Sequence, residues 1–217
     1  MLSCRVGRLV DILNEGTCLT ATFLLIRHAA HVHLDRRLSG RLPGVALSDD
    51  GRAQAAALAR GLAGERIDRI ACSPLERTRD TADSIAAACG LTSPTPVDAL
   101  IEIDMGDWTG AAFGDLGGAA WDAWNQQRGT ARIPGGETMA EAQARIVGYM
   151  AEVATAEDGA IVALVTHSDM IRAAAAHALG LPLDHLLRFD VGPASVSRIV
   201  MGDWGARLIS LNERVAA

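Results

Sequence analysis

The sequence predicts an α/β fold, a single three-layer α/β/α domain with a mostly parallel central sheet and helices on both faces. Two short apolar runs, residues 23–26 and 160–165, are typical of buried strands because they are rich in branched and aromatic side chains and too short for helices. Capping signals mark helices between and after these runs, so strands and helices alternate along the chain. The 217 residues, 49% of them hydrophobic, are enough for one sizeable core.

Capping residues predict where the first two helices begin and end. Ser48 precedes an alanine-rich segment with two acids in its first turn, which favours a helix over residues 49–63. Ser73 followed by Pro74 has the pattern of an N-cap with proline at the first helical position, and Gly90 is the expected end of that helix.

The other elements complete the alternation of strands and helices. Thr138-x-x-Glu141 is a capping-box pattern and predicts the start of a further helix. The remaining predictions are strands over 68–72 and 95–97, an irregular stretch over 99–118, a short helix over 119–127, a helix after residue 167 that ends at Gly180, and a hairpin of strands 196–201 and 206–211 around 202–205. No internal repeat or low-complexity linker divides the chain, so we expect one domain over residues 22–217, preceded by an arm or extension over residues 1–21.

Composition excludes several classes of function. The net charge is −6 with no basic block, which argues against nucleic-acid binding. No apolar run approaches the roughly 20 residues of a membrane span, and residues 1–21 lack a signal-peptide core. Four cysteines without Cys-x-x-Cys spacing indicate free thiols in a reducing compartment, so a cytoplasmic location is expected. The chain has no lysine, so any anion site must use arginine, histidine and backbone amides.

Two strands end in histidine, and this places polar side chains at one edge of the sheet. Arg27-His28 follows the first apolar run, and Thr166-His167 follows the run at 160–165. Arg77 lies just after the end of the strand predicted at 68–72. Open α/β sheets hold their ligands at the carboxyl ends of the strands, so these side chains can meet in one pocket. Taken alone, an arginine and a histidine after a strand are more often a solvated turn.

Six segments, in order, resemble the motifs of one known family. They are Arg27-His28-Ala29, Leu47-Ser48-x-x-Gly51-x-x-Gln54-Ala55, Ser73-Pro74-Leu75-Glu76-Arg77-Thr78 with Thr81-Ala82, Glu102-x-x-x-Gly106-x-Trp108-x-Gly110, Pro134-Gly135-Gly136-Glu137-Thr138 and Val165-Thr166-His167-Ser168. They are similar to the motifs of the histidine phosphatase superfamily, also called phosphoglycerate mutase-like. The match runs from about Thr22 to Leu211, and six motifs in the family's order are a specific signal.

The resemblance implies a metal-independent phosphomonoesterase that acts on a small phosphorylated metabolite. His28 would attack as a neutral imidazole and form a phosphohistidine. Arg27, Arg77 and His167 would hold the phosphoryl oxygens and stabilise the charge that develops during transfer. Glu102 would protonate the leaving oxygen and later activate water, and burial could raise its pKa enough for the first role. No metal or cofactor is expected, because two guanidinium groups and a histidine supply the positive charge.

The loop after His28 departs from the family pattern. The usual Gly-Glu-Thr-x-x-Asn is replaced by residues 29–34, so the asparagine that often helps to bind phosphate has no obvious counterpart. Ser39, Gly40 and Arg41 are candidates to replace it, and Ser168 is a further candidate phosphate ligand. The substrate would be chosen by loops 29–44 and 111–134, whose shape the sequence does not fix.

Three alternatives stay open from the sequence. A mutase is disfavoured because the longer mutase text around the acidic loop and the closing C-terminal tail are both missing. A dinuclear zinc site is suggested by His31-x-His33-x-Asp35, although Arg36 stands where that pattern needs a further histidine. A non-catalytic phosphate-binding protein has no need for an acid at the position of Glu102. A homodimer is left open as the assembly.

Overall fold

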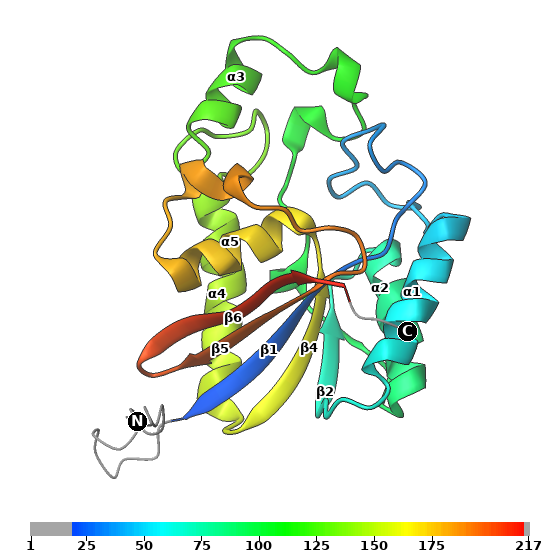
Figure 1. Ribbon diagram of the computed structural model, residues 1–217. Coiled ribbons are helices and arrows are strands. Elements are labelled where there is room, and N and C mark those ends of the chain that lie inside the picture. Colours follow the sequence, from blue (N-terminus) through cyan, green and yellow to red (C-terminus); the bar gives the residue numbers. More distant parts are fainter. Residues whose placement is uncertain (1–18, 215–217) are drawn as a thin grey trace, which may run out of the picture.

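A computed structural model describes residues 19–214 and contains one six-stranded sheet (Figure 1). The strand order is β3-β2-β4-β1-β5-β6, in which β1 to β4 run parallel to one another, β5 runs antiparallel to β1, and β6 runs antiparallel to β5. The strands are β1 (Thr20–Arg27), β2 (Arg69–Cys72), β3 (Thr95–Pro96), β4 (Ala160–Thr166), β5 (Val196–Gly202) and β6 (Gly205–Glu213). This arrangement confirms the predicted α/β class with a mostly parallel sheet.

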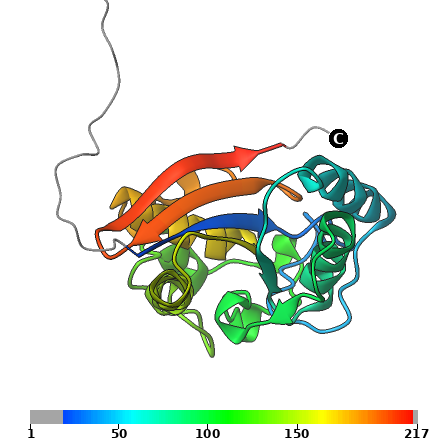
Figure 2. The same cartoon turned by 90° about the horizontal axis from the view of Figure 1, so that it is seen from below.

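Helices cover both faces of the sheet (Figures 1 and 2). The α-helices are α1 (Asp49–Leu62), α2 (Glu76–Cys89), α3 (Ala119–Gln126), α4 (Met139–Ala156) and α5 (Ser168–Leu179). Short 3-10 helices cover Asp98–Leu100, Gly106–Trp108, Phe113–Asp115 and Leu183–Arg188. The pair α1–α2 packs on one face and the pair α4–α5 on the other, which completes the three layers. Among the described residues, no helix combines the length and apolar character needed to cross a membrane.

The strand β1 is apolar without alternation because both of its faces are covered. Phe23 and Leu25 contribute to the core beneath α4 and α5, whereas Leu24 and Ile26 contribute to the core beneath α1 and α2. All four side chains are fully buried. A continuous apolar run is typical of strands with helices on both faces.

Capping side chains form most of the predicted helix ends. The Ser48 hydroxyl accepts a hydrogen bond from the N–H of Gly51 at the start of α1, and Thr138 forms a capping box with Glu141 at the start of α4. Helices α2 and α5 both end at a glycine in the left-handed conformation, Gly90 with φ 65° and Gly180 with φ 61°.

The prediction for the start of α2 was wrong. The helix begins at Glu76 with Leu75 in the N-cap position, and Ser73 and Pro74 precede it. The Ser73 hydroxyl accepts a weak hydrogen bond from the N–H of Leu75 at 3.4 Å and also bonds to His167, at 2.8 Å. A serine before proline therefore serves a long-range contact here, in place of the local cap that its sequence pattern predicts.

The described part of the chain begins just before the first strand. The first strand begins at Thr20, two residues before the domain start expected at Thr22, and residues 1–18 of the predicted arm lie outside the described residues.

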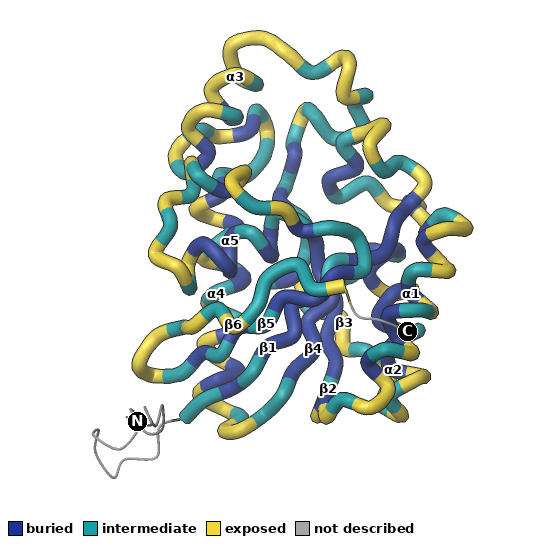
Figure 3. The backbone as a smooth tube through the Cα atoms, viewed as in Figure 1, coloured by how far each residue is buried: buried dark blue, intermediate teal, exposed yellow. Residues whose placement is uncertain are grey.

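The strands β1 and β4 end beneath segments that contain α3 and the 3-10 helices (Figure 1). These segments are much more exposed than the sheet below them (Figure 3). The ends of β1 and β4 therefore lie below less buried parts of the chain (Figures 1 and 3).

Candidate active site

The pairing of β1 with β4 brings the two predicted histidines together. Arg27 lies beside Thr166 in the parallel register, so His28 and His167 follow at the same level. The N–H of His28 donates to the carbonyl oxygen of Thr166 at 3.0 Å. The centroids of the two imidazole rings are 5.2 Å apart, and the rings are inclined by 62°. Both side chains are almost entirely buried, at 3% and 0% exposure.

The contacts of His28 leave a defined nitrogen for chemistry. Its Nδ1 lies 2.8 Å from the carbonyl oxygen of Ala29, so Nδ1 carries the proton and donates it. Burial lowers the pKa of His28 well below its usual range, and the charges of Arg77 and Arg27 lower it further. The ring is therefore neutral at physiological pH, and Nε2 keeps its lone pair.

Several motif residues hold the segment that follows this histidine. The N–H of Ala29 donates to Thr81 Oγ1 at 3.1 Å, and the N–H of Ala30 donates to Gln54 Oε1 at 3.0 Å. A Cβ at Gly51 would lie 1.8 Å from the carbonyl oxygen of Ala30. Only glycine therefore allows the first turn of α1 to pack this closely against the backbone of Ala30. Helices α1 and α2 thus fix the backbone on one side of the site.

Two arginines flank His28 and keep hydrogen-bond donors unused. Arg77 is 1% exposed, and its Nη2 donates to the carbonyl oxygen of Gly40 at 2.8 Å and to His167 Nδ1 at 3.4 Å. Among the described residues, its buried Nε and Nη1 have no partner, and neither has the buried Nε of Arg27. Arg27 Nη1 donates to the carbonyl oxygen of Val191 at 2.6 Å. Buried guanidinium donors without acceptors are costly, and those of the two arginines together favour an anion between them.

The second histidine is fixed by side chains from three elements. Ser73 Oγ lies 2.8 Å from His167 Nε2, and this contact helps to fix the plane of the ring. A hydroxyl can either donate or accept, so the contact is compatible with either tautomer of the imidazole. The other nitrogen, Nδ1, faces Arg77 and lies 3.7 Å from Glu102 Oε2. Burial and the charge of Arg77 lower the pKa of His167 well below its usual range. Ser73 was missed as a site residue, because its sequence pattern indicated a helix cap.

Glu102 has the environment of a carboxylic acid that can give up a proton near neutral pH. Its side chain is 14% exposed, and Oε1 accepts one hydrogen bond, from the N–H of Ile103 at 3.0 Å. Burial and the nearby charge of Asp169 raise the pKa of Glu102 to about 7, against the opposing effect of Arg77. The competing acids Asp104 and Asp107 do not line the cavity.

The loop that carries Glu102 is held from behind by Arg41. The Arg41 guanidinium donates to the carbonyl oxygen of Glu102 at 2.8 Å and pairs with Glu137 at 2.9 Å and Asp104 at 3.4 Å. A Cβ at Gly136 would lie 2.3 Å from the carbonyl oxygen of Asp104, so the segment around Gly136 packs directly on this loop. Arg41 was predicted as one substitute for the missing asparagine, but its guanidinium is engaged with this loop and it does not line the cavity.

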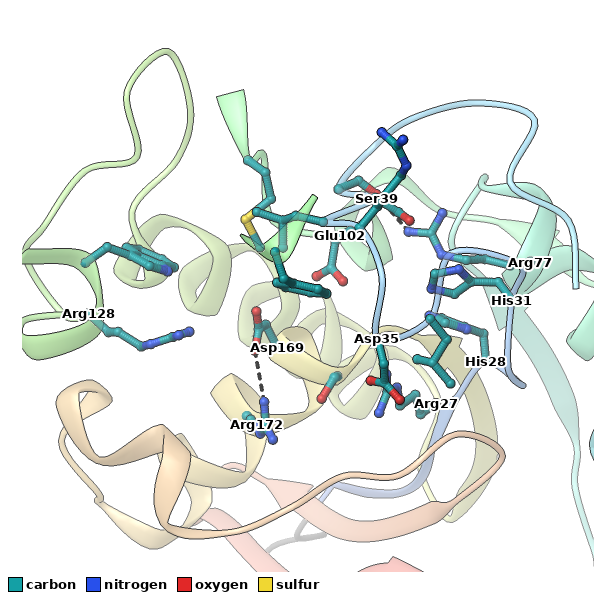
Figure 4. Close-up of a pocket in the computed structure, with 18 of the residues that line it drawn as sticks. Arg27, His28, His31, Asp35, Ser39, Arg77, Glu102, Arg128, Asp169 and Arg172 are labelled. Carbon is teal, nitrogen blue, oxygen red and sulfur yellow. Dashed lines mark hydrogen bonds and ion pairs between the residues drawn. The ribbon is translucent and has the colours of Figure 1, made fainter. Parts of the chain in front are cut away.

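His31 is a further residue at the site, and the sequence did not reveal it in this role. It is 9% exposed, and its ring lies 5.2 Å from that of His28 (Figure 4). Its Nδ1 accepts the N–H of His33 at 3.2 Å, so the ring proton of the neutral form is on Nε2. Burial and the charges of Arg77 and Arg27 lower the pKa of His31 to about 4. His31 is thus a neutral donor beside the first histidine.

The zinc alternative finds no ligand set in the described part of the chain. Among residues 19–214, no three histidine, cysteine, aspartate or glutamate side chains are arranged to hold a metal ion. The Nδ1 of His31 is already used by the backbone, and His33 Nδ1 lies 3.4 Å from the Ser39 hydroxyl. The histidine pattern at His31 and His33 therefore belongs to the architecture of the loop.

The remaining predicted phosphate ligands line the same cavity. Ser39 is 6% exposed, and Gly40 turns the chain with φ 48°. The carbonyl oxygen of Gly40 accepts from Arg77, so this residue positions a guanidinium. The Ser168 hydroxyl lies 3.5 Å from the carbonyl oxygen of Val191, which Arg27 also approaches. Direct contacts of Ser39, Gly40 and Ser168 with phosphate stay predictions.

A cavity of about 370 Å³, which is within the range of small-metabolite sites, is lined by Arg27, His28, His31, Ser39, Gly40, Arg77, Glu102 and Ser168 (Figure 4). The fully buried His167 and Ser73 do not line it. Five arginines and three carboxylates line it, so the cavity is cationic although the whole chain carries a net charge of −6. Figure 4 shows His28, Arg27 and Arg77 at one end of the cavity and Arg128 at the other. The remaining lining residues are Leu34, Asp35, Arg37, Leu38, Met105, Phe113, Trp121, Trp124, Asp169 and Arg172.

The sequence is similar to a known protein family and to several of its members. Residues 23–214 match the family described as the histidine phosphatase superfamily (branch 1). Phosphoserine phosphatase 1 of Hydrogenobacter thermophilus is 32% identical over 195 residues, which cover 87% of this chain and 90% of the relative. Glucosyl-3-phosphoglycerate phosphatase of Mycolicibacterium vanbaalenii is 34% identical over 173 residues, which cover 75% of this chain and 76% of the relative.

The fold is also similar to solved structures of phosphatases. The native structure of a mycobacterial glucosyl-3-phosphoglycerate phosphatase is similar with a TM-score of 0.80 and 28% sequence identity, and the match covers 90% of this chain and 100% of that chain. The matched region of the family includes every residue that lines the cavity.

Proposed function

Because this chain belongs to the histidine phosphatase superfamily (branch 1) and is a phosphatase of that family, we propose that it hydrolyses a small phosphorylated metabolite through a phosphohistidine on His28. The family and the enzyme class predicted from the sequence are confirmed by these matches. The residue roles, the independence from metal and the class of substrate are our proposal. The relatives are named for different substrates, phosphoserine and glucosyl-3-phosphoglycerate, so membership alone does not select one.

The observation that carries the proposal is the state of His28. Its ring is neutral, and Nδ1 is occupied by the carbonyl oxygen of Ala29, which leaves Nε2 free. His28 lines the cavity beside two arginines whose buried donors include some without a partner among the described residues. A nitrogen nucleophile needs its lone pair, and a phosphoryl group needs several positively polarised donors around it. Both requirements meet at this one point of the structure.

The first chemical step transfers the phosphoryl group to the enzyme. His28 Nε2 attacks phosphorus, an N–P bond forms, and the P–O bond to the organic group breaks. The cationic Arg27 and Arg77 stabilise the charge on the transferring oxygens, and the neutral His167 holds Arg77 through its Nδ1, so a direct contact of His167 with these oxygens stays a prediction. Glu102 gives its proton to the departing oxygen, which its raised pKa of about 7 allows near neutral pH.

The second step returns the enzyme to its starting state. Glu102, now a carboxylate, removes a proton from a water molecule as that water attacks the phosphohistidine. The N–P bond breaks, inorganic phosphate forms, and His28 recovers its neutral ring. The guanidinium groups supply positive charge throughout, so the scheme requires no metal ion.

His31 fills part of the role that an asparagine plays in the usual family pattern. Its Nε2–H is fixed as a donor by the backbone contact at Nδ1, and its low pKa keeps it neutral during turnover. A neutral donor at this place binds a phosphoryl oxygen without stabilising the phosphoenzyme as strongly as another cation would.

The test measures hydrolysis of para-nitrophenyl phosphate in the presence of a chelator, together with trapping of the phosphoenzyme. We expect full activity with the chelator and a labelled enzyme whose phosphate is stable to alkali and labile to acid, as N-linked phosphate is. His28→Ala should remove the label and lower kcat by about 10⁴-fold or more. The exposed His177 on α5 provides a matched control, and His177→Ala should keep both.

Three results would contradict the proposal. They are loss of activity on chelation, a labelled intermediate that survives in His28→Ala, and isomerisation of a phosphoglycerate primed by a bisphosphate without release of phosphate. The last result would instead identify a mutase.

A further inference from the structure

The segment 191–195, which leads into β5, holds both the backbone and the side chain of Arg27 (orange in Figure 1). The N–H of Arg27 donates to the carbonyl oxygen of Ser195 at 3.1 Å. Arg27 Nη1 donates to the carbonyl oxygen of Val191 at 2.6 Å. The direction of the Arg27 guanidinium therefore depends on the orientation of the peptide group that joins Val191 to Gly192.

Asn212, in the edge strand β6, holds the opposite side of that peptide group. Its Oδ1 accepts the N–H of Gly192 at 2.7 Å. The carbonyl oxygen of Val191 and the N–H of Gly192 belong to one planar trans peptide, so they point in opposite directions. Arg27 and Asn212 thus bind the two ends of one rigid dipole. Each of these two hydrogen bonds polarises the peptide group and strengthens the other.

The backbone of β6 is shaped for this contact. Between neighbouring pairs of the β5–β6 ladder, Leu211 and Asn212 lie opposite the single residue Ser197, which is the pattern of a β-bulge. Asn212 has a φ of 57°, a conformation that asparagine tolerates better than most other residues. Its N–H donates to Ser197 Oγ at 3.0 Å. Bulges turn a side chain away from the regular ladder, and here the side chain reaches the segment 191–195.

The other contacts of this segment do not fix the same peptide group. The Ser195 hydroxyl donates to the carbonyl oxygen of Gly192 at 2.7 Å, but that oxygen belongs to the following peptide group. The Ser168 hydroxyl lies 3.5 Å from the carbonyl oxygen of Val191, which is at the limit of a hydrogen bond. Among the described residues, Asn212 is the one acceptor for the N–H of Gly192.

We infer that Asn212 is a positioning residue for phosphoryl transfer, because it fixes the Val191–Gly192 peptide group and through it the guanidinium of Arg27 beside His28. This inference rests on the proposed role of Arg27. Asn212 does not line the cavity, so it acts through Arg27 and not on the substrate. With Nη1 anchored, the buried Nε of Arg27, which has no partner among the described residues, keeps a fixed direction.

The experiment is a double-mutant cycle between Asn212 and Arg27, with kcat and KM measured for para-nitrophenyl phosphate. Asn212→Gly removes the acceptor but keeps the backbone conformation, which glycine adopts freely. We expect kcat to fall about tenfold and KM to change by less than about threefold. Arg27→Met should lower kcat by about 10²-fold or more. In the Arg27→Met protein, Asn212→Gly should cost less than about twofold, because the group that it positions is gone.

Two further variants separate positioning from a general effect on β6. Asn212→Asp keeps an acceptor and tolerates the same φ, so kcat should stay within about threefold of the wild type. Ile209→Gly is the matched control, because Ile209 lies at the neighbouring irregularity of the same ladder, is 52% exposed, and has no polar side chain. It should leave kcat per folded molecule unchanged. Melting curves give the folded fraction, and Asn212→Ser replaces Asn212→Gly in the cycle if the latter does not fold.

Three results would overturn the inference. They are a wild-type kcat in Asn212→Gly, a loss from Asn212→Gly that is as large in the Arg27→Met protein as in the wild type, and an equal loss in Ile209→Gly. Each leaves the phosphatase proposal intact, provided that the wild type is active and Arg27→Met is impaired. A wild type without turnover, or an Arg27→Met protein with the wild-type kcat, would instead contradict the proposed function and the inference with it.

Discussion

The two ends of the cavity are built in different ways. At the phosphoryl end, His28 and His167 follow the paired strands β1 and β4, and both are at most 3% exposed. At the distal end, Phe113 lies in a 3-10 helix and is 45% exposed, and α3 is largely exposed except for Trp124. The first end is fixed by the register of a sheet, and the second by the packing of short segments above it.

This difference indicates that the two ends of the cavity serve different functions. Phosphoryl transfer needs several donors held at fixed distances, and strand ends in register provide that precision. Recognition of the organic group needs a surface whose shape can vary between related proteins, and loops on a rigid scaffold provide it. Changes at the phosphoryl end are therefore expected to affect kcat, whereas changes at the distal end are expected to affect KM and substrate preference.

The largest expected effect concerns Glu102, which lies where the two ends meet. Glu102→Gln removes the acid, so esters with poor leaving groups should lose about 10²- to 10⁴-fold in kcat/KM, while para-nitrophenyl phosphate loses far less. The wild-type kcat/KM for an alkyl phosphate should fall as pH rises through about 7, because burial and Asp169 raise the pKa of Glu102 and only its protonated form donates. This falling limb should be absent in Glu102→Gln.

Asp107→Asn is the matched control, since Asp107 is a neighbouring acid that does not line the cavity. Equal losses on activated and unactivated esters, or a falling limb that persists in Glu102→Gln, would show that another group is the acid.

A smaller effect is expected for His31, the neutral donor beside His28. His31→Ala should lower kcat/KM by about 10- to 100-fold, because one fixed donor to the phosphoryl group is lost. His31→Gln, which still offers an N–H, should recover part of the loss. The defect should be the same at pH 6 and pH 8, because burial and the two arginines lower the pKa of His31 to about 4 and it stays neutral over this range.

His33→Ala provides the comparison, because it keeps the backbone N–H that fixes the His31 ring. A loss in His33→Ala as large as that in His31→Ala would mean that the loop, and not the Nε2–H of His31, is responsible. That result would mean that the loop after His28, like the segments at the distal end, acts through its overall shape and not through one fixed donor.

The same division explains what could be predicted from the sequence. The strand ends, the caps at Ser48 and Thr138, and the order of motifs depend on local patterns. These predicted the fold and that His28, Arg77, Glu102 and His167 lie close together. Arg128 gave no signal because its place in the cavity depends on its packing against Trp124 and Asn125, which no local pattern predicts. His31 gave a misleading signal because its spacing from His33 resembles a metal motif, whereas the backbone uses its Nδ1.

Ser73 shows how a long-range contact can override a local pattern, and it carries the smallest expected effect. Its hydroxyl lies 2.8 Å from His167 Nε2, so Ser73→Ala removes a contact that orients the ring without removing the ring itself. One hydrogen bond of this kind is worth about 1 kcal/mol, and we expect kcat to fall about three- to tenfold with little change in KM. The His167 imidazole signals in NMR spectra, assigned by their absence in His167→Gln, should shift in Ser73→Ala. The half-buried Ser84 on α2, whose hydroxyl donates to the carbonyl oxygen of Asp80 in its own helix, is the matched control, and Ser84→Ala should shift neither kcat nor those signals. If Ser73→Ala behaves like Ser84→Ala, Arg77 and Glu102 alone hold the His167 ring, and the precision of the phosphoryl end comes from fewer contacts than the geometry indicates.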